Sequence, residues 1–277
     1  MNPVRLTIAP VPDWVDAARL LGVDAPIDRA PTEAHRVRLS VSLPPDVAAD
    51  VVARLRGLGL DGQPLSVTAS PALSRTVVRA ARLRDARARR DTTPGFTRPG
   101  ARASGEGRYS LTPEALALAV GGLARGGAVV DACCGSGGSA IGFARAGCRV
   151  IAIEHSAERL AEARHNAAIY GVAGHIAFVQ GDACVEVPAR GGDVLFVDPP
   201  WGEGYDKRAT DRAAFPLLDA LLARDLTGYG AIWVKVPSSF AVASIPGGMA
   251  SAWFGEAGGD AHRIKFVLVQ SPPTRPG

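Results

Sequence analysis

The stretch Asp198-Pro199-Pro200-Trp201 combines residue types that can present a planar amine for reaction. Two consecutive prolines stiffen the backbone and remove two N–H donors, so the Pro199 carbonyl and the Asp198 carboxylate can both accept hydrogen bonds from one NH₂ group. Such acceptors draw the amine hydrogens out of the plane of the ring. The nitrogen lone pair is then less conjugated with the ring and becomes free to attack a methyl donor. The Trp201 indole can stack on the ring that carries the amine. We therefore predict amine methylation, with Asp198, Pro199 and Trp201 as catalytic residues.

A glycine-rich loop lies upstream in the segment VVDACCGSGGSAIGFA. Gly135, Gly137 and Ala140 match the G-x-G-x-x-A turn of dinucleotide-binding folds, and S-adenosylmethionine enzymes use a loop of similar shape. The loop has no Gly-Lys-Ser/Thr, which excludes a P-loop. The loop alone leaves two cofactors open.

Three acidic residues follow successive predicted strands. Glu154 suits the two ribose hydroxyls of an adenosine, which either cofactor carries. Asp182 suits a place beside the adenine, and Asp131 suits a charged ammonium group, which the methionine half of S-adenosylmethionine has and NAD lacks. Each carboxylate taken singly could be a solvated loop residue, but three in register favour a binding site. With the proline turn, they favour S-adenosylmethionine as cofactor and S-adenosylhomocysteine as its product.

These residues sit in a regular alternation of helices and apolar strands that begins at about residue 109. Apolar strands end at Ala132, Glu154, Gln180, Asp198 and Val236, and the segments 249–254 and 263–270 fit a closing hairpin. A helix is expected from Pro113 with Thr112 as its N-cap, and another from Ser156 to Gly171. The pattern predicts an α/β, Rossmann-like class I methyltransferase fold, with a mainly parallel seven-stranded sheet and a closing antiparallel hairpin.

The first ninety residues have shorter alternating units and carry no recognisable chemistry. We predict three parts: a small N-terminal α/β domain at 1–90 that ends in an Arg-rich helix from about Ala72 to Arg90, a linker or substrate-facing loop at 91–108, and the methyltransferase domain at 109–277. Pro and Gly in the linker disfavour regular structure.

Positive charge is concentrated near the predicted boundary. Ten Arg between Arg75 and Arg108 stand against Asp85, Asp91 and Glu106, a balance of +7. An RNA partner would be attracted there. However, 28 of the 31 basic residues are Arg, which a GC-rich, bacterial genome would also produce. A small-molecule acceptor, with this helix merely solvated, is the alternative.

Other classes of protein are disfavoured by composition. No apolar run reaches the roughly 18 residues of a membrane span, and the N-terminus lacks the features of a signal peptide, so we expect a cytoplasmic protein without a membrane partner. The four cysteines form no C-x-x-C pair and the histidines have no metal spacing, so we expect no metal.

From about Phe96 to Val269 the chain resembles the trimethylguanosine synthase family of cap guanine-N2 methyltransferases. The resemblance rests on GFTRPGARASGEGRYSLTPE, VVDACCGSGG, CRVIAIEHSAERLAEARHNAAIYGV, FVQGDA and DPPWG, in this order and spacing. It implies that Thr112, Asp131, Glu154 and Asp182 surround the cofactor and that Trp201 stacks on a guanine-like base.

Two departures from the family pattern concern the acceptor. Asp198 replaces the usual serine, and D-P-P-W also occurs in adenine-N6 and ribosomal guanine-N2 methyltransferases. Arg108 precedes Tyr109 where the family prefers an aromatic pair. Residues 1–90 match nothing in the family, and a bacterium would have no eukaryotic cap.

The expected reaction is methylation of an exocyclic nucleobase amine, with guanine N2 of RNA or of a guanine nucleotide as first choice. The alternatives are a small natural product, adenine N6 in RNA or DNA, and a non-catalytic RNA-binding role. The remaining expected cofactor residues are Cys133, Gly135, Gly137, His155 and Ala183; the expected acceptor residues besides Trp201 are Phe96, Arg98, Tyr109, Gly202 and Lys235, although a lysine at a strand end is more often structural.

Overall fold

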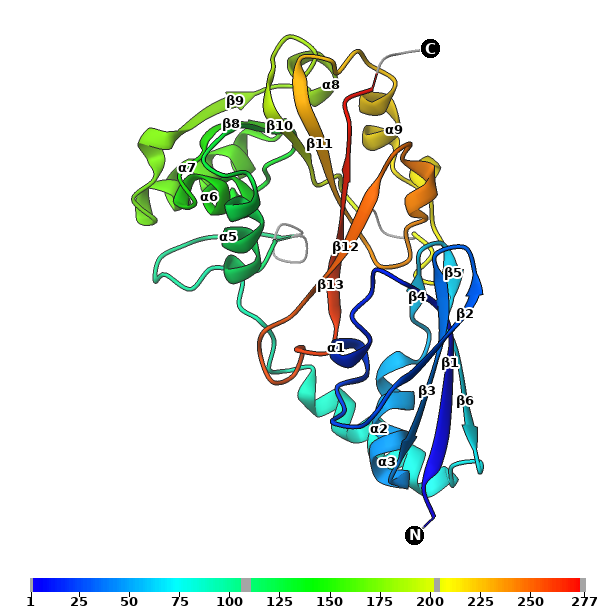
Figure 1. Ribbon diagram of the computed structural model, residues 1–277. Coiled ribbons are helices and arrows are strands. Elements are labelled where there is room, and N and C mark those ends of the chain that lie inside the picture. Colours follow the sequence, from blue (N-terminus) through cyan, green and yellow to red (C-terminus); the bar gives the residue numbers. More distant parts are fainter. Residues whose placement is uncertain (1, 106–110, 202–204, 275–277) are drawn as a thin grey trace.

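The computed structural model describes residues 2–105, 111–201 and 205–274, and its largest element is a seven-stranded sheet (Figure 1). The sheet has the order β12-β13-β11-β10-β7-β8-β9. Strands β7 to β11 run parallel, and β13 is antiparallel to both β11 and β12. The predicted class I methyltransferase fold with its closing hairpin is confirmed. The strands are β7 (Ala128–Asp131), β8 (Arg149–Glu154), β9 (Ile176–Gln180), β10 (Gly192–Val197), β11 (Tyr229–Val236), β12 (Met249–Phe254) and β13 (Ile264–Ser271).

Helices cover both faces of this sheet, as the apolar runs of its strands require. On one face α5 (Glu114–Leu123), α6 (Gly138–Arg145) and α7 (Ala157–Ile169) share a core with Val129, Phe196 and Trp233. On the other face α8 (Ala183–Glu186) and α9 (Pro216–Leu222) pack on Val130 and Val197. Figure 1 shows the two helical layers on either side of the strands. Short 3₁₀ turns lie at Ala173–His175, Arg212–Ala214 and Val242–Ser244.

The helix ends follow local chemistry, with one correction. Ser156 caps α7 through a hydrogen bond from the Arg159 amide, and Gly171 follows the last turn with φ +71°, as predicted. The predicted cap of α5 is wrong. Thr112 is buried and its hydroxyl pairs with that of Ser139 at 3.0 Å, so the N-cap position passes to Pro113, which has no side-chain cap bond.

The N-terminal region forms a separate four-stranded antiparallel sheet with the order β2-β3-β1-β6. Its elements follow the ferredoxin-like pattern β-α-β-β-α-β, interrupted by a small hairpin between the last helix and the last strand. They are β1 (Val4–Pro12), α1 (Ala17–Leu21), β2 (Asp28–Glu33), β3 (Arg36–Leu43), α2 (Pro45–Leu55), the hairpin strands β4 (Gly59–Leu60) and β5 (Gln63–Pro64), and β6 (Ser66–Ser70). The division into domains stays a prediction.

The Arg-rich helix α3 (Arg75–Ala88) packs on α2 and is shorter than expected, because Ser74 caps it. Residues 91–105 contain no helix or strand, as their Pro and Gly content predicted. No helix within the described residues is long and apolar enough to cross a membrane.

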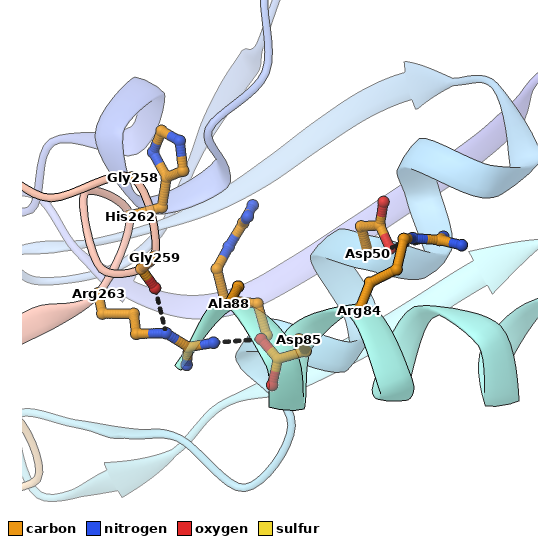
Figure 2. A pocket seen from close by; sticks show the side chains of 9 residues that line it. Asp50, Arg84, Asp85, Ala88, Gly258, Gly259, His262 and Arg263 are labelled. Atoms are coloured by element: carbon orange, nitrogen blue, oxygen red, sulfur yellow. Dashed lines mark hydrogen bonds and ion pairs between the residues drawn. The ribbon is translucent and has the colours of Figure 1, made fainter. Parts of the chain in front are cut away.

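Contacts join the N-terminal sheet to the β12–β13 hairpin and the loop between its strands. Phe254 is part of the N-terminal apolar core. The Asp260 carboxylate accepts hydrogen bonds from the amide and hydroxyl of Thr93 at 2.8 and 2.7 Å. A cavity of about 180 Å³ lies beside this loop. Figure 2 shows residues that line it, where Arg263 bonds to the Asp85 carboxylate and to the Gly259 carbonyl. Because the ion pair between Arg263 and Asp85 joins the two regions at this cavity, we regard it as part of the contact between them.

Candidate functional site

The expected acidic residues lie in a row along the carboxyl edge of the large sheet. Asp131 ends β7 and Glu154 ends β8, while Asp182 lies two residues after β9 and Asp198 directly follows β10. Strands β10, β7, β8 and β9 are adjacent in this order. Ligands of such sheets bind at the carboxyl ends of the strands, so the parallel topology brings these four carboxylates to one edge.

Asp131 lies fully buried at the centre of this row, paired across the sheet with Phe196 and Ala152. Its Oδ1 accepts a long hydrogen bond of 3.4 Å from the Cys133 amide. Its Oδ2 has no hydrogen-bond partner among the described residues. The pKa of Asp131 is raised to about 8, mainly by burial and then by the Asp198 carboxylate. A buried carboxylate with an oxygen that accepts no hydrogen bond favours a bound cation.

Glu154 is held by two backbone donors. Its Oε2 accepts from the Gly135 amide and its Oε1 from the Ser156 amide, each at 2.9 Å. These bonds fix the carboxylate against the glycine loop, in which Gly135 and Gly137 have φ of +54° and +91°. A side chain at either position would be strained. Gly137 also lies too close to α7 for a larger residue, because a Cβ there would be 3.1 Å from that of Ala163.

The other expected cofactor residues frame the same edge. Asp182 caps α8 by accepting from the Cys184 amide at 2.8 Å, and Ala183 is buried behind it. His155 is exposed next to Glu154. The Cys133 thiol donates to the Asp198 carbonyl at 2.9 Å, which ties the glycine loop to the proline turn. Burial raises the pKa of that thiol well above its usual value, so Cys133 stays neutral.

The proline turn meets a lysine from the neighbouring strand. Lys235 Nζ lies 2.5 Å from Asp198 Oδ2, and the two side chains are 5% and 14% exposed. The same ammonium lies 5.2 Å from the centroid of the Trp201 ring. Burial raises the pKa of Asp198, and Lys235 opposes that shift. Lys235 therefore neutralises Asp198, a contact that the sequence analysis did not foresee.

Trp201 lies between the two helical layers, where it packs against the cores on both faces of the sheet. Its ring packs edge-on against Tyr205 with centroids 6.3 Å apart, and its Nε1 is buried without a hydrogen-bond partner in the described part of the chain. Because Lys235 occupies one side of the indole, we expect an aromatic ligand to stack on the other side. Pro199 is buried beside it.

Phe96 and Arg98, which we expected to contact the acceptor, both lie against the ring of Tyr170. The Phe96 ring packs on Tyr170 with centroids 5.7 Å apart. Arg98 lies over the same Tyr170 ring at 4.9 Å and donates to the Ile169 carbonyl. The contacts described for these two residues do not include Trp201 or Asp198, so their acceptor role stays a prediction. Tyr109 and Gly202 lie outside the described residues.

The structure also identifies two residues of α7 that sequence reasoning missed. Asn166 is fully buried, accepts from the Arg102 amide, and donates to the carbonyls of Arg102 and Ser136. Glu162 accepts from the Ser136 hydroxyl at 2.6 Å and from the Ser104 amide at 3.1 Å. One helix thus holds both the linker and the glycine loop. Their spacing of four residues was the available signal.

The side chains fit S-adenosylmethionine. Its ammonium group would satisfy the orphaned Asp131 Oδ2, and Glu154 keeps free lone pairs for the ribose hydroxyls. NAD has no ammonium group to place beside Asp131. Within the described ranges, no group of three or more His, Cys, Asp or Glu could hold a metal ion.

Comparisons with known proteins find relatives over part of the chain. Residues 126–215 match the family model described as RNA cap guanine-N2 methyltransferase. A trimethylguanosine synthase from Schizosaccharomyces pombe is 35% identical over 104 residues, which are 34% of this chain and 43% of the yeast protein. The chain thus matches less than half of that relative's length. The match over residues 126–215 supports the predicted family, enzyme class and cofactor.

Solved structures resemble the chain over a larger part but with lower identity. An RNA methyltransferase from Salinibacter ruber, in complex with S-adenosyl-L-homocysteine, is 18% identical with a TM-score of 0.39 and covers 58% of this chain and 92% of its own. A hypothetical protein from Thermus thermophilus is 18% identical with a TM-score of 0.45 and covers 65% and 95%.

Proposed function

We propose that this chain, whose residues 126–215 belong to the RNA cap guanine-N2 methyltransferase family, transfers a methyl group from S-adenosylmethionine to the exocyclic N2 amine of a guanine in RNA. One observation carries the proposal. The Asp198 carboxylate and the Trp201 ring converge on Lys235. Asp198 follows β10, the strand next to β7, which ends in the orphaned Asp131 carboxylate. The proposed binding site for the cofactor's ammonium group at Asp131 thus lies next to the proposed binding site for a planar amine at Asp198 and Trp201.

When bound, S-adenosylmethionine supplies an activated methyl group on a sulfonium. Asp131 holds the ammonium end of that molecule, and Glu154 orients its ribose. On the acceptor side, the Asp198 carboxylate and the Pro199 carbonyl accept the two amine hydrogens, and Trp201 fixes the plane of the base. Catalysis then rests on positioning, with little need for a strong general base.

Helix α3 supports RNA as the acceptor. Arg84 and Arg89 are paired with Asp50 and Asp85 at 2.7 and 3.0 Å. Five further arginines are exposed and have no acidic partner within the described residues: Arg75, Arg79, Arg82, Arg87 and Arg90. Exposed arginines without acidic partners attract phosphate groups, so these five side chains favour RNA binding.

Mass spectrometry of digested RNA tests the proposal. Guanine-containing RNA is incubated with the protein and isotopically labelled S-adenosylmethionine, and the nucleosides are separated. We expect label in N2-methylguanosine. Label in N6-methyladenosine would move the activity to adenine, and unlabelled RNA would favour a small-molecule acceptor.

Trp201→Ala is expected to weaken acceptor binding by about 1–3 kcal/mol, the usual value of stacking on one base. This loss corresponds to a rise of roughly 5- to 150-fold in the acceptor KM. Trp201→Phe retains a ring and should lose less. Initial rates at varied RNA concentration measure the effect, and an unchanged KM in Trp201→Ala would exclude stacking.

Arg79→Ala/Arg82→Ala is expected to lower RNA affinity and to reduce the slope of log K against log salt by about 1.4, because each lost phosphate contact removes about 0.7 for a single strand. Fluorescence anisotropy at several salt concentrations measures the slope. Arg84→Ala is the matched control, since Asp50 already neutralises that residue. Equal slopes in the double variant and the wild type would remove α3 from the RNA-binding surface.

A further inference from the structure

The hairpin β4–β5 of the N-terminal region reaches the loops that follow the site. Its turn, Asp61-Gly62, has positive φ at both residues, as a two-residue hairpin turn requires. The Asp61 amide donates to the Ser238 carbonyl at 2.9 Å, and the Gly62 amide donates to the Ser239 carbonyl at 3.0 Å. This insertion into the ferredoxin-like pattern thus contacts the segment three residues beyond Lys235.

The Asp61 side chain adds two more contacts. Its Oδ1 accepts from the Val242 amide at 2.8 Å, and its Oδ2 pairs with Arg36 of β3 at 2.9 Å. Both side chains of that ion pair are largely buried, at 18% and 11% exposed. Asp61 therefore joins the N-terminal sheet to the loop 238–242.

The hairpin also abuts the segment that continues the proline turn. At Gly59, a Cβ would lie 2.0 Å from the Arg208 carbonyl oxygen, so the two backbones are in direct contact. The segment 206–210 is bonded in turn to the loop 238–242: the Ser239 hydroxyl donates to the Asp206 carbonyl, and the Thr210 amide donates to the Ser239 carbonyl, each at 3.0 Å.

These contacts lead back to Trp201 through aromatic rings. Tyr205 packs against Trp201 on one side and against Phe215 on the other, with centroids 6.3 and 6.4 Å apart. Phe215 packs on Phe240, which lies within the loop that Asp61 holds. Movement of the hairpin would therefore displace the rings that support the indole.

We infer that Asp61 is a positioning residue for the acceptor side of the site, and that the N-terminal region holds the Trp201 turn in place through the β4–β5 hairpin. The inference rests on the proposed function for its role in methyl transfer. It also gives residues 1–90 a part in the reaction without any contact to the cofactor. The glycine loop follows strand β7 and Glu154 ends β8, and both lie outside the segments that the hairpin contacts.

Fluorine NMR of the full chain labelled with 5-fluorotryptophan tests this directly. The protein has four tryptophans, and Trp201→Phe assigns the resonance of Trp201. In Asp61→Ala we expect that resonance to shift or broaden while the Trp233 resonance stays. Asp61→Asn tolerates positive φ and keeps the acceptor for Val242 but loses the ion pair with Arg36, so it should restore the wild-type spectrum in part. Asp85→Asn removes the ion pair with Arg263, a contact between the two regions away from the hairpin, and should leave Trp201 unchanged.

Gly59→Ala provides a second variant should Asp61→Ala fail to fold, because it separates the hairpin from Arg208 without altering Asp61. A Trp201 resonance identical to the wild type in the folded variant would overturn the inference.

Kinetics on the same samples test the functional part. We expect kcat/KM for the acceptor to fall about tenfold in Asp61→Ala, as small misplacements of reacting groups do, with the Kd of S-adenosylmethionine unchanged. An unaltered kcat/KM would also overturn the inference. If the wild-type protein methylates no guanine-containing RNA, the proposed function fails, and the fluorine spectra still decide whether the hairpin holds the turn.

Discussion

Asp198→Ala is expected to lower the single-turnover rate of methyl transfer by about 100-fold or more, the scale on which positioned proton acceptors contribute. The Kd of S-adenosylmethionine should stay nearly constant, because Asp131 and Glu154 are intact. The rate falls because the amine loses the acceptor that draws its hydrogens out of the ring plane and so frees the nitrogen lone pair. Rapid-quench measurement with labelled cofactor gives the rate, and calorimetric titration gives the Kd.

The ion pair between Asp198 and Lys235 requires a control for folding. Removing Asp198 alone takes the carboxylate of this ion pair away from a buried ammonium, which typically costs about 3–5 kcal/mol of stability. Asp198→Ala/Lys235→Met removes both charges and should recover the melting temperature but not the rate. Asp198→Ser restores the acceptor oxygen of the family's usual residue and should recover part of the rate. An active, folded Asp198→Ala protein would refute the catalytic assignment.

The order of carboxylates at the sheet edge could be predicted because the geometry of parallel strands is regular. Once β7 to β10 were recognised from their apolar runs, Asp131, Glu154, Asp182 and Asp198 had to reach the same edge. Neither the pairing of Lys235 with Asp198 nor its place beside Trp201 could be predicted, because both depend on which strands are neighbours and on their register. The single lysine within the apolar strand AIWVKV was the available signal.

The contact of the hairpin with the site was not predictable for a different reason. Asp61-Gly62 is a recognisable turn signal, but its flanking strands have only two residues each and show no periodicity. Asp61 and Val242 are 181 residues apart, and their hydrogen bond depends on how the two sheets dock. Local patterns therefore predicted the elements, while the contacts between the two sheets required the tertiary structure.

The affinity for S-adenosylmethionine is expected to rise with pH, by about tenfold per pH unit between about pH 6 and 7. The pKa of Asp131 is raised to about 8, mainly by burial and then by Asp198, so this group is protonated in the free protein at neutral pH. A cationic ligand favours the ionised carboxylate, so binding releases one proton from Asp131. Calorimetry in buffers of different ionisation enthalpy measures the proton release, and Asp131→Asn should bind weakly and without this pH dependence.

The same group has the opposite effect on the stability of the free protein. Since its folded-state pKa lies above the unfolded value of about 3.9, its favourable contribution is complete below that value and is lost as the pH rises through about 8. At alkaline pH, Asp131→Asn should therefore melt at a higher temperature than the wild type without ligand, while at about pH 4 the difference should nearly vanish. Thermal unfolding across this pH range measures both. A variant that loses cofactor affinity and gains no stability at high pH would show that Asp131 is not the buried, uncompensated charge from which the cation site is inferred.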